Sequence, residues 1–507
     1  MCGRVCSITT TVLGVILVIV AFVVSFVVVP LVINNTILNE VILFNDTLQM
    51  ERFEELPFPL NFTIRVFSIQ NSDEVLQGAK PIVVEMGPYV YSSPKQRLVD
   101  AIDEDTITFR GFEGFNFDVE GSYPYTEDDI VNVANIPYNT VLQVAEVDFP
   151  GLLGIVNSNL DNVFREYSAP IISVPVRTLF WEGFRFCVNP GILATVICDL
   201  IKSFAVDSDN IIEQEDGSLS FSLFRFKDSI PGIQIKMGRG VNDPAELGKI
   251  FTLNNSSTLD KWVDDGENTS VCNMINGTDG ALFAPFVDRN EPIYVYSDDI
   301  CRSVTLRYQY DTEYEGIPVV RYTANEWMFD NEEGCFCLNV TTGINAENGC
   351  MLPGAMELFT CVGAFLVLSN PHFLYADPIL QNGVEGLNPD VDLHRITVDL
   401  EPNTGIAITG ASRAQFNMFL RPVTSITSTE NVTTTLIPIF WVDESRMKNK
   451  IMLTPFCNHS LEPHTIRRRL TAGRLFHILQ VRQLFRRCRA VTSCHGLTND
   501  FTTDKND

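Results

Sequence analysis

The sequence contains few of the residues and none of the short motifs that common classes of enzyme require. It has six histidines in 507 residues, and all of them follow Asn370. A Gly-x-Ser-x-Gly nucleophile turn, a His-Glu-x-x-His metal helix, a Walker loop and a dinucleotide fingerprint are all missing. We therefore expect a protein that is not an enzyme and that needs no metal and no cofactor.

Positive charge is also scarce. Lys and Arg together number 36 against 63 Asp and Glu, which gives a formal net charge of -27. Such an acidic surface repels the phosphates of nucleic acids at long range, so we expect no nucleic acid partner. The acidic excess is also typical of a surface that only needs solubility, and by itself it indicates no particular ligand.

Charged side chains are absent between residues 7 and 39, where the sequence is strongly apolar. This run exceeds the roughly 20 residues that cross a bilayer as a helix, and it is too long for a signal peptide. Arg4 precedes the run, and the first charges after it are Glu40 and Asp46, so the positive-inside rule places the N-terminus in the cytoplasm. We predict a cytoplasmic segment at residues 1–7, a transmembrane helix at 8–33 and an extracellular or lumenal region at 34–445.

Asn-x-Ser/Thr acceptors are frequent after the apolar run, in agreement with exposure to a secretory compartment. A further acceptor, Asn34, lies too near the bilayer to be used. The predicted glycosylation sites are Asn45, Asn61, Asn254, Asn255, Asn268, Asn276, Asn339, Asn431 and Asn458.

Cysteines are sparse in the region after the apolar run, except where six of them lie close together in the sequence. That pattern is typical of a disulfide framework in an oxidising compartment. A zinc site is the alternative, and it is disfavoured because Cys335 and Cys337 are too close for the usual ligand pair and no histidine lies among the six. The six are Cys272, Cys301, Cys335, Cys337, Cys350 and Cys361.

The region between residues 45 and 445 is predicted to form strands with one helical insertion, and no linker divides it. β-branched and aromatic residues partly alternate in short segments bounded by Gly, Pro and Asn. Between Tyr138 and Phe164 the apolar spacing becomes helical, with a break at Pro150 and Gly151. The expected fold class is therefore α+β. The expected strand segments include 61–67, 81–85, 106–109, 218–224, 293–296 and 396–400.

Several motifs resemble those of the class B scavenger receptors and follow one another in that family's order. Glu85-Met-Gly-Pro-Tyr-Val-Tyr91 is similar to the E-x-G-P-Y-x-Y element, and Cys272-Asn-Met-Ile-Asn-Gly-Thr-Asp-Gly280 is similar to the C-x-x-I-N-G-T-D element. The resemblance extends from the apolar run to about Ser445, and the family includes the fatty acid translocase, the high-density lipoprotein receptor, lysosomal integral membrane proteins and sensory neuron membrane proteins. Further matching motifs are Ser297-Asp-Asp-Ile-Cys-Arg-Ser303, Cys335-Phe-Cys337, Pro371-His-Phe-Leu-Tyr-Ala376, Gly386-Leu-Asn-Pro389 and Asp399-Leu-Glu-Pro-Asn-Thr-Gly405.

The resemblance implies a large antiparallel β-barrel with a membrane-distal helical bundle and an apolar tunnel. It also implies palmitoylation of Cys2 and Cys6 on the cytoplasmic edge of the membrane helix. The disulfides that it implies are Cys272 with Cys335, Cys301 with Cys361, and Cys337 with Cys350.

Two further pairs of residues are judged against the same resemblance. Cys187 and Cys198 have no counterpart in the family's pattern, so they form either an extra disulfide or buried thiols. His372 and His394 each lie inside a family motif, which favours packed or hydrogen-bonded histidines over catalytic ones.

One face of the helical insertion lies where the family's ligand-receiving bundle lies. The alternative interpretation is the packing stripe that any helix in a bundle needs. The chain has no lysine between Pro137 and Ile201, which argues against a basic site for fatty acid carboxylates of the kind found in the fatty acid translocase. The candidate ligand-binding residues are Phe149, Leu152, Val156, Leu160, Phe164 and the nearby cation Arg165.

Residues 446–507 depart from the family, whose members re-enter the membrane through a second helix. We expect a divergent basic tail without that helix, in which residues 466–490 form a basic amphipathic helix. Such a tail is a different splice ending, an incorrect gene model or a segment that lies on a surface.

The sequence thus predicts a membrane-anchored, scavenger receptor-like protein that binds lipids, fatty acids or lipoproteins and transfers apolar ligand through a tunnel to the membrane. The alternative is an endolysosomal membrane receptor that binds and traffics a protein cargo. Both the plasma membrane and the endolysosomal membrane remain open as locations.

Overall fold

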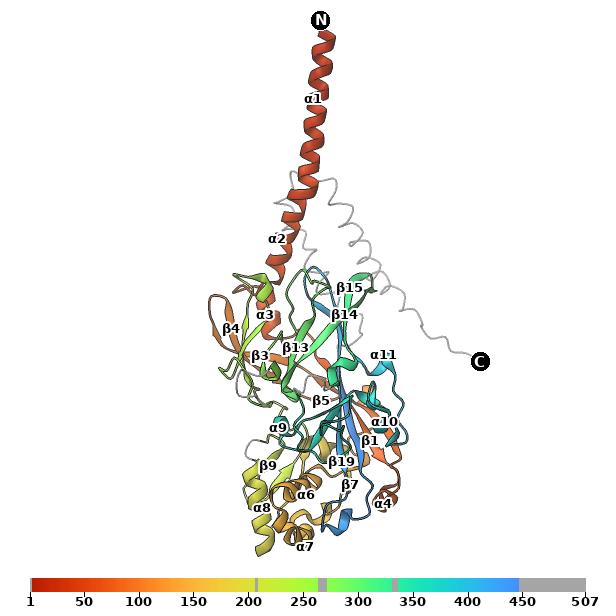
Figure 1. Cartoon of the computed structure of the whole chain (residues 1–507). Helices are drawn as coiled ribbons and strands as arrows, with labels where there is room; N and C mark the ends of the chain where they lie inside the picture. Colours follow the sequence, from red (N-terminus) through yellow and green to blue (C-terminus); the bar gives the residue numbers. More distant parts are fainter. Residues whose placement is uncertain (1, 206–207, 263–270, 331–335, 446–507) are drawn as a thin grey trace, which may run out of the picture. The chain divides into compact units, whose positions relative to one another are not determined.

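The computed structural model describes residues 2–205, 208–262, 271–330 and 336–445 of the chain (Figure 1). One compact unit contains Met1–Thr312 and Pro318–Arg446, and a second contains Glu313–Ile317 and Met447–Asp507. The basic tail predicted at residues 446–507 lies outside the described residues.

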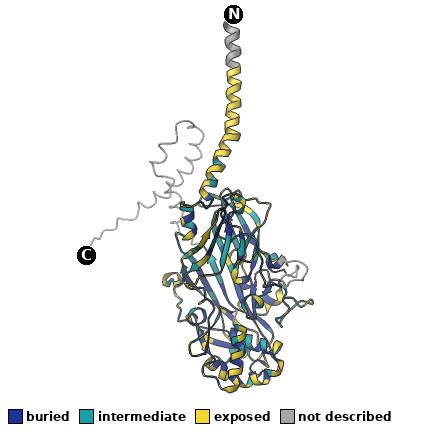
Figure 2. Cartoon of the chain, turned by 90° about the vertical axis from the view of Figure 1, so that its left-hand side faces the viewer, coloured by how far each residue is buried: buried dark blue, intermediate teal, exposed yellow. Residues whose placement is uncertain are grey.

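A long apolar helix begins the first unit. It consists of α1 (Cys2–Val23), a π-helical turn (Val24–Val28) and α2 (Val29–Val41), and Pro30 is tolerated because it lies in the first turn of α2. The 30 residues Val12–Val41 span about 45 Å at the usual helical rise, which is enough to cross a bilayer. Figure 2 shows this stretch as mostly exposed, as expected of a helix whose apolar side chains face lipid.

The helix continues past residue 33, where we expected it to end. Thr36 does not interrupt it, because its hydroxyl donates to the carbonyl oxygen of Val32 at 2.8 Å. The chain leaves the helix at Ile42, and Val41, Ile42 and Leu43 are buried in an apolar cluster with Phe109 of the neighbouring sheet. The apolar run is therefore packed directly against the body of the unit.

Within the described residues, eleven strands form the largest sheet, and its hydrogen-bonded strand pairs are antiparallel. The strand order is β13-β14-β15-β18-β19-β20-β1-β2-β5, with β17 paired to β19 and β16 paired to β17. No pairing joins the end strands β13 and β5 in this part of the chain, so the sheet as described is open. The strands are β1 (Leu60–Ile69), β2 (Val83–Ser93), β5 (Asn116–Phe117), β13 (Ile293–Ser297), β14 (Arg302–Tyr314), β15 (Ile317–Ala324), β16 (Ala355–Glu357), β17 (Leu366–Ser369), β18 (Ile396–Leu400), β19 (Ala407–Leu420) and β20 (Thr435–Ser445).

Three smaller sheets complete the strand structure of the described residues. The first contains β3 (Lys95–Ile102), β4 (Thr106–Glu113), β11 (Gln234–Gly238) and β12 (Ile250–Leu253). The second contains β8 (Phe184–Phe186), β9 (Ile211–Glu213) and β10 (Leu219–Phe221), and the third contains β6 (Ile130–Ala134) and β7 (Ile171–Pro175). All six segments that we expected to be strands overlap strands of the structure, so the strand-rich class with a helical insertion is confirmed.

The predicted helical insertion forms α6 (Ile136–Asp148) and α7 (Leu153–Phe164), and a further helix, α8 (Ile192–Phe204), follows later in the chain. The side chain of Asn135 caps α6 by accepting a bond from the backbone N–H of Tyr138 at 3.3 Å. A 3-10 turn at Pro150–Leu152 separates α6 from α7, as the Pro-Gly break predicted. In Figure 1 these helices lie at the end of the unit that is far from α2.

Of the second unit, only residues 313–317 lie in the described part of the chain.

Short helices connect the remaining elements of the first unit. The short helices are α3 (Leu48–Glu54), α4 (Ser72–Val75), α5 (Val119–Ser122), α9 (Phe359–Val362), α10 (Pro378–Asn382) and α11 (Val391–His394).

His372 belongs to a buried polar network beside the large sheet. Its Nδ1 accepts a bond from the backbone N–H of Asn388 at 3.1 Å, so the ring proton lies on Nε2, which is 2.6 Å from a carboxylate oxygen of Glu85. The indole N–H of Trp441 donates to the same oxygen at 3.0 Å. Burial raises the pKa of Glu85, but the hydrogen bonds from His372 and Trp441 lower it more. The pKa of Glu85 therefore lies below its ordinary value.

His394 stacks on His372 with a centroid separation of 4.3 Å. Its Nδ1 accepts a bond from the backbone N–H of Asp390 at 2.9 Å. Burial is the main cause that lowers the pKa of His394 to about 4, and the neighbouring His372 is the second. Both histidines are therefore packed and hydrogen-bonded.

We predict that stability decreases as the pH falls from about 6.5 to about 4. In this window the unfolded chain protonates His394 while the folded protein keeps it neutral, which costs about 1.4 kcal/mol per pH unit. Thermal unfolding of the wild type and of His394→Asn at pH 7 and pH 5 checks this, because the variant cannot be protonated at this position. Equal losses of melting temperature in the two proteins would contradict it.

Candidate functional site

The predicted ligand face of the helical insertion divides into a buried and an accessible part. Val156, Leu160 and Phe164 of α7 are buried in the main hydrophobic core. Phe164 is fully buried, and its ring lies 5.4 Å from Phe186 and 5.1 Å from Tyr138. These three side chains contact the interior, so a bound molecule reaches them only if the helices move apart.

Phe149 and Leu152 are half-buried and lie where α6 gives way to α7. The ring of Phe149 contacts Phe204 at the end of α8, with 5.8 Å between the centroids. This contact brings α8 to the predicted face, a helix that the sequence analysis did not include.

Helix α8 presents apolar side chains on more than one side. Ala194, Ile197, Cys198 and Ile201 are buried, while neighbouring apolar residues project outwards. Ile192 is 89% exposed and Val196 is 52% exposed. We define the apolar helical surface as seven exposed or half-buried apolar residues of α7, α8 and the turn before α7. They are Phe149, Leu152, Ile155, Ile192, Leu193, Val196 and Phe204.

Exposed apolar side chains gathered in this way make the apolar helical surface a candidate binding site. A signal for it is present in the sequence, because the apolar residues between 192 and 204 occupy more of the helix circumference than packing on one side requires.

Arg165, the cation nominated from the sequence, lies directly after α7 and is exposed. One of its terminal nitrogens donates to the carbonyl oxygens of Val188 at 2.8 Å and Asn189 at 2.9 Å. The guanidinium therefore supports the loop that precedes α8.

A disulfide between Cys187 and Cys198 fixes the same loop to α8. The sequence left a bridge and two buried thiols open, and the structure contains the bridge. The backbone N–H of Cys187 also donates to Val163 of α7 at 2.6 Å. Helices α7 and α8 are thus joined through one short loop.

The cysteine-rich region contains two of the disulfides that the resemblance implies, Cys301–Cys361 and Cys337–Cys350. Cys272 is also disulfide-bonded, but Cys335 lies outside the described residues. Cysteines joined in this way are unavailable as zinc ligands.

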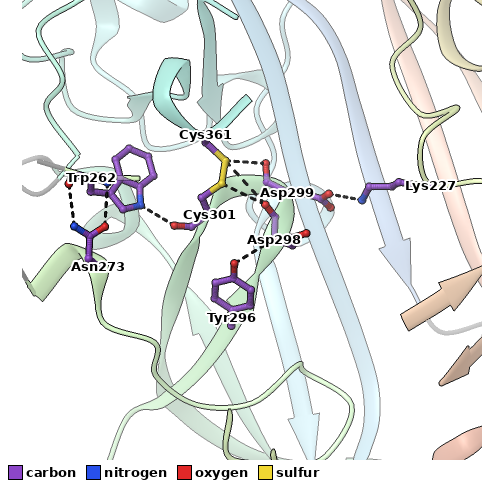
Figure 3. Close-up of a disulfide and its surroundings, with 8 residues drawn as sticks. All are labelled: Lys227, Trp262, Asn273, Tyr296, Asp298, Asp299, Cys301 and Cys361. Atoms are coloured by element: carbon purple, nitrogen blue, oxygen red, sulfur yellow. Dashed lines mark hydrogen bonds and ion pairs between the residues drawn. A yellow bond between two sulfur atoms is a disulfide. The ribbon is translucent and has the colours of Figure 1, made fainter. Parts of the chain in front are cut away.

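Figure 3 shows how the Cys301–Cys361 bridge is held. The indole N–H of Trp262 donates to the carbonyl oxygen of Cys301 at 2.6 Å, and Lys227 forms an ion pair with Asp299. Asp298 accepts a bond from the hydroxyl of Tyr296 at 3.1 Å, and burial together with Asp299 raises the pKa of Asp298. The bridge therefore lies where residues of several distant segments meet.

The predicted modification sites differ in accessibility. Asn61 and Asn276 are half-buried, whereas the other described acceptors are exposed. Asn268 and Asn458 lie outside the described residues, and Cys2 and Cys6 belong to α1. Glycosylation and palmitoylation remain predictions. The exposed acceptors are Asn45, Asn254, Asn255, Asn339 and Asn431.

Comparison with known proteins identifies the family. Residues 12–466 match the model of the CD36 family. The chain belongs to the CD36 family. It is therefore a membrane protein of the class B scavenger receptor type, in agreement with its N-terminal apolar helix.

Its relatives include sensory neuron membrane proteins of insects. Sensory neuron membrane protein 2 of Drosophila melanogaster is 35% identical over 510 residues, which cover 89% of this chain and 91% of the relative. The protein of the same name from Aedes aegypti is 33% identical, covering 81% of this chain and 85% of the relative. Sensory neuron membrane protein 1 of Mamestra brassicae is 30% identical, covering 83% of this chain and 78% of the relative.

We predict that Cys187→Ser combined with Cys198→Ser lowers the free energy of unfolding by about 2 to 4 kcal/mol, because the short loop loses its cross-link. Thermal unfolding of the purified protein measures this loss. Cys2→Ser combined with Cys6→Ser is the matched control, since it removes two cysteines from α1, and it should melt like the wild type. A melting temperature unchanged by the loss of Cys187 and Cys198 would mean that the bridge does not stabilise the helices.

Proposed function

We propose that this CD36-family protein is a membrane-anchored receptor that binds lipids, fatty acids or lipoproteins at the apolar helical surface. The observation that carries the proposal is the exposure of Ile192 and its apolar neighbours on α8, at the end of the unit far from the membrane helix. Burying such side chains against acyl chains contributes about 0.8 kcal/mol per methylene.

The charges near this surface favour ligands without a free carboxylate. The guanidinium of Arg165 already donates to two backbone carbonyls, and Lys202 of α8 forms an ion pair with Glu213 at 2.7 Å. A fatty acid anion would compete with these bonds for a cation. Long-chain alcohols, esters and the surface of a lipoprotein would not, so they fit the site better.

We further propose that apolar ligand passes from this surface through an interior tunnel of a barrel-like ectodomain towards the bilayer. In this arrangement residues 1–7 are cytoplasmic, residues 8–33 span the membrane and residues 34–445 form the ectodomain. The packing of Val41, Ile42 and Leu43 against the body of the unit supports it, since the membrane helix and the ectodomain then meet without a flexible linker. The protein acts either at the cell surface or in an endolysosomal membrane.

The test compares variants at two exposed positions of α8, one apolar and one polar. Val196→Glu places a carboxylate on the apolar helical surface, where covering it by a ligand costs several kcal/mol. We expect it to weaken binding of a fluorescent long-chain alcohol by at least tenfold. Thr195→Glu introduces the same charge at an exposed polar position of the same helix and should bind like the wild type.

Both variants should retain the melting temperature of the wild type, because positions 195 and 196 are exposed. Undiminished binding by Val196→Glu would contradict the proposal. Intact lipid binding together with loss of a protein partner would instead favour the alternative receptor, which holds a protein cargo.

We predict a different outcome for the buried part of the predicted face. Phe164→Ala removes a fully buried ring and should lower the free energy of unfolding by about 3 to 5 kcal/mol. Thermal unfolding and lipid binding measured on the same sample separate the two roles. A stable Phe164→Ala protein that no longer binds lipid would make this side chain part of the ligand site.

A further inference from the structure

A cavity of about 300 Å³ lies away from the apolar helical surface. It is bordered by β2, β5, the π-helical turn Thr178–Glu182 and the loops around Glu127 and Asp228. None of its residues belongs to the apolar helical surface. The lining residues are Tyr91, Phe115, Phe117, Glu127, Arg177, Trp181, Glu182 and Asp228.

Aromatic rings form one side of this cavity. The ring of Trp181 lies 4.9 Å from Tyr91 and 4.9 Å from Phe115, and Phe117 lies 5.4 Å from Tyr91. Tyr91 is buried, whereas the other three rings are half-buried and retain accessible surface. Each ring contacts at least one other ring of the lining, so the wall is preformed.

Carboxylates outnumber cations in the lining. The lining contains the carboxylates of Glu127, Glu182 and Asp228 and one guanidinium, that of Arg177. Arg177 also forms an ion pair with Asp128, which lies outside the lining. The Nε of Arg177 lies 3.7 Å from a carboxylate oxygen of Glu182. The positive charge of Arg177 is thus offset by its own partners, and the cavity keeps an excess of negative charge.

The remaining two carboxylates are held in place by hydrogen bonds, and Asp228 accepts one of these from the hydroxyl of Ser229 at 3.3 Å. Glu127 accepts from the hydroxyl of Tyr91 at 3.0 Å, and Asp228 accepts from the backbone N–H of Phe115 at 3.2 Å. Burial and the nearby Glu127 raise the pKa of Tyr91, so its hydroxyl stays protonated as the donor. These bonds hold both carboxylates beside the aromatic wall without neutralising their charges.

We propose that this cavity binds an organic cation of the quaternary ammonium class, such as the trimethylammonium group of choline. The faces of aromatic rings attract cations, and Trp is the strongest of them. A quaternary ammonium carries apolar methyl groups that suit ring faces, and it needs no hydrogen-bond acceptor because it has no N–H. The carboxylates compensate its charge. The volume is at the small end of ligand cavities, which suits a headgroup-sized molecule.

The test uses the full chain purified in dodecyl maltoside, which contains no quaternary ammonium. Isothermal titration compares choline with 3,3-dimethylbutanol, which has the same shape but no charge. We expect choline to bind at least tenfold more tightly. Glycerophosphocholine identifies the source of the cation, since tighter binding than choline indicates a lipid headgroup and weaker binding indicates a free small cation.

Charge-removing variants locate the binding. Glu127→Gln combined with Asp228→Asn keeps both hydrogen-bond acceptors and removes two negative charges, so choline should bind at least tenfold more weakly. Asp73→Asn combined with Glu74→Gln removes the same charge from exposed positions on α4, outside the lining, and choline should bind as in the wild type. Equal affinity for choline and its neutral isostere would overturn the proposal. Unchanged choline binding by the Glu127/Asp228 variant, or no binding at millimolar choline, would overturn it too.

Discussion

Aromatic packing against β20 connects the central sheet to the rest of the main unit. The ring of Phe440 lies 4.9 Å from Phe416 on the next strand, 5.1 Å from Phe180 and 5.6 Å from Phe224. Phe180 and Phe224 belong to segments outside the large sheet, so these contacts fix the turn Thr178–Glu182 against it. A buried aromatic side chain typically contributes several kcal/mol to the free energy of unfolding. These contacts therefore hold the turn firmly against the sheet.

Both candidate binding regions depend on this turn and on the residues directly after it in the chain. Trp181 comes directly after Phe180 and lines the cavity, while Phe184 and Phe186 continue into β8. Phe186 then packs on Phe164, and the Cys187–Cys198 disulfide secures α8. One core therefore supports the aromatic wall of the cavity and the apolar helical surface, although the two share no residue.

Much of the architecture could be predicted because it depends on local signals. The charge-free run gave the membrane helix, and short alternating segments gave the strands. The family motifs implied two disulfides that the structure contains. The helix end at Val41 was missed because polar residues such as Asn34 and Asn35 do not break a helix that already has its backbone bonds.

The site was harder to predict because burial depends on contacts between distant segments. Helical spacing in α7 could not show that Phe164 contacts Phe186 rather than a ligand, since core faces and binding faces have the same period. The cavity brings together Tyr91, Phe115 and Trp181 from three separate stretches, and no local pattern connects them. The wide apolar arc of α8 is visible in the sequence, but which of its residues are exposed, Ile192 among them, follows only from the packing of its neighbours.

In the function proposed for this protein, lipid contacts the apolar helical surface. Photocrosslinking tests it most directly, with a long-chain alcohol that carries a diazirine near the end of its chain, added to the full-length protein and followed by peptide mapping. We expect labelled peptides to include residues 192–204 of α8 and unlabelled alcohol in excess to suppress this labelling. The absence of label on α8, or labelling of α8 that excess alcohol does not reduce, would contradict lipid contact at this surface.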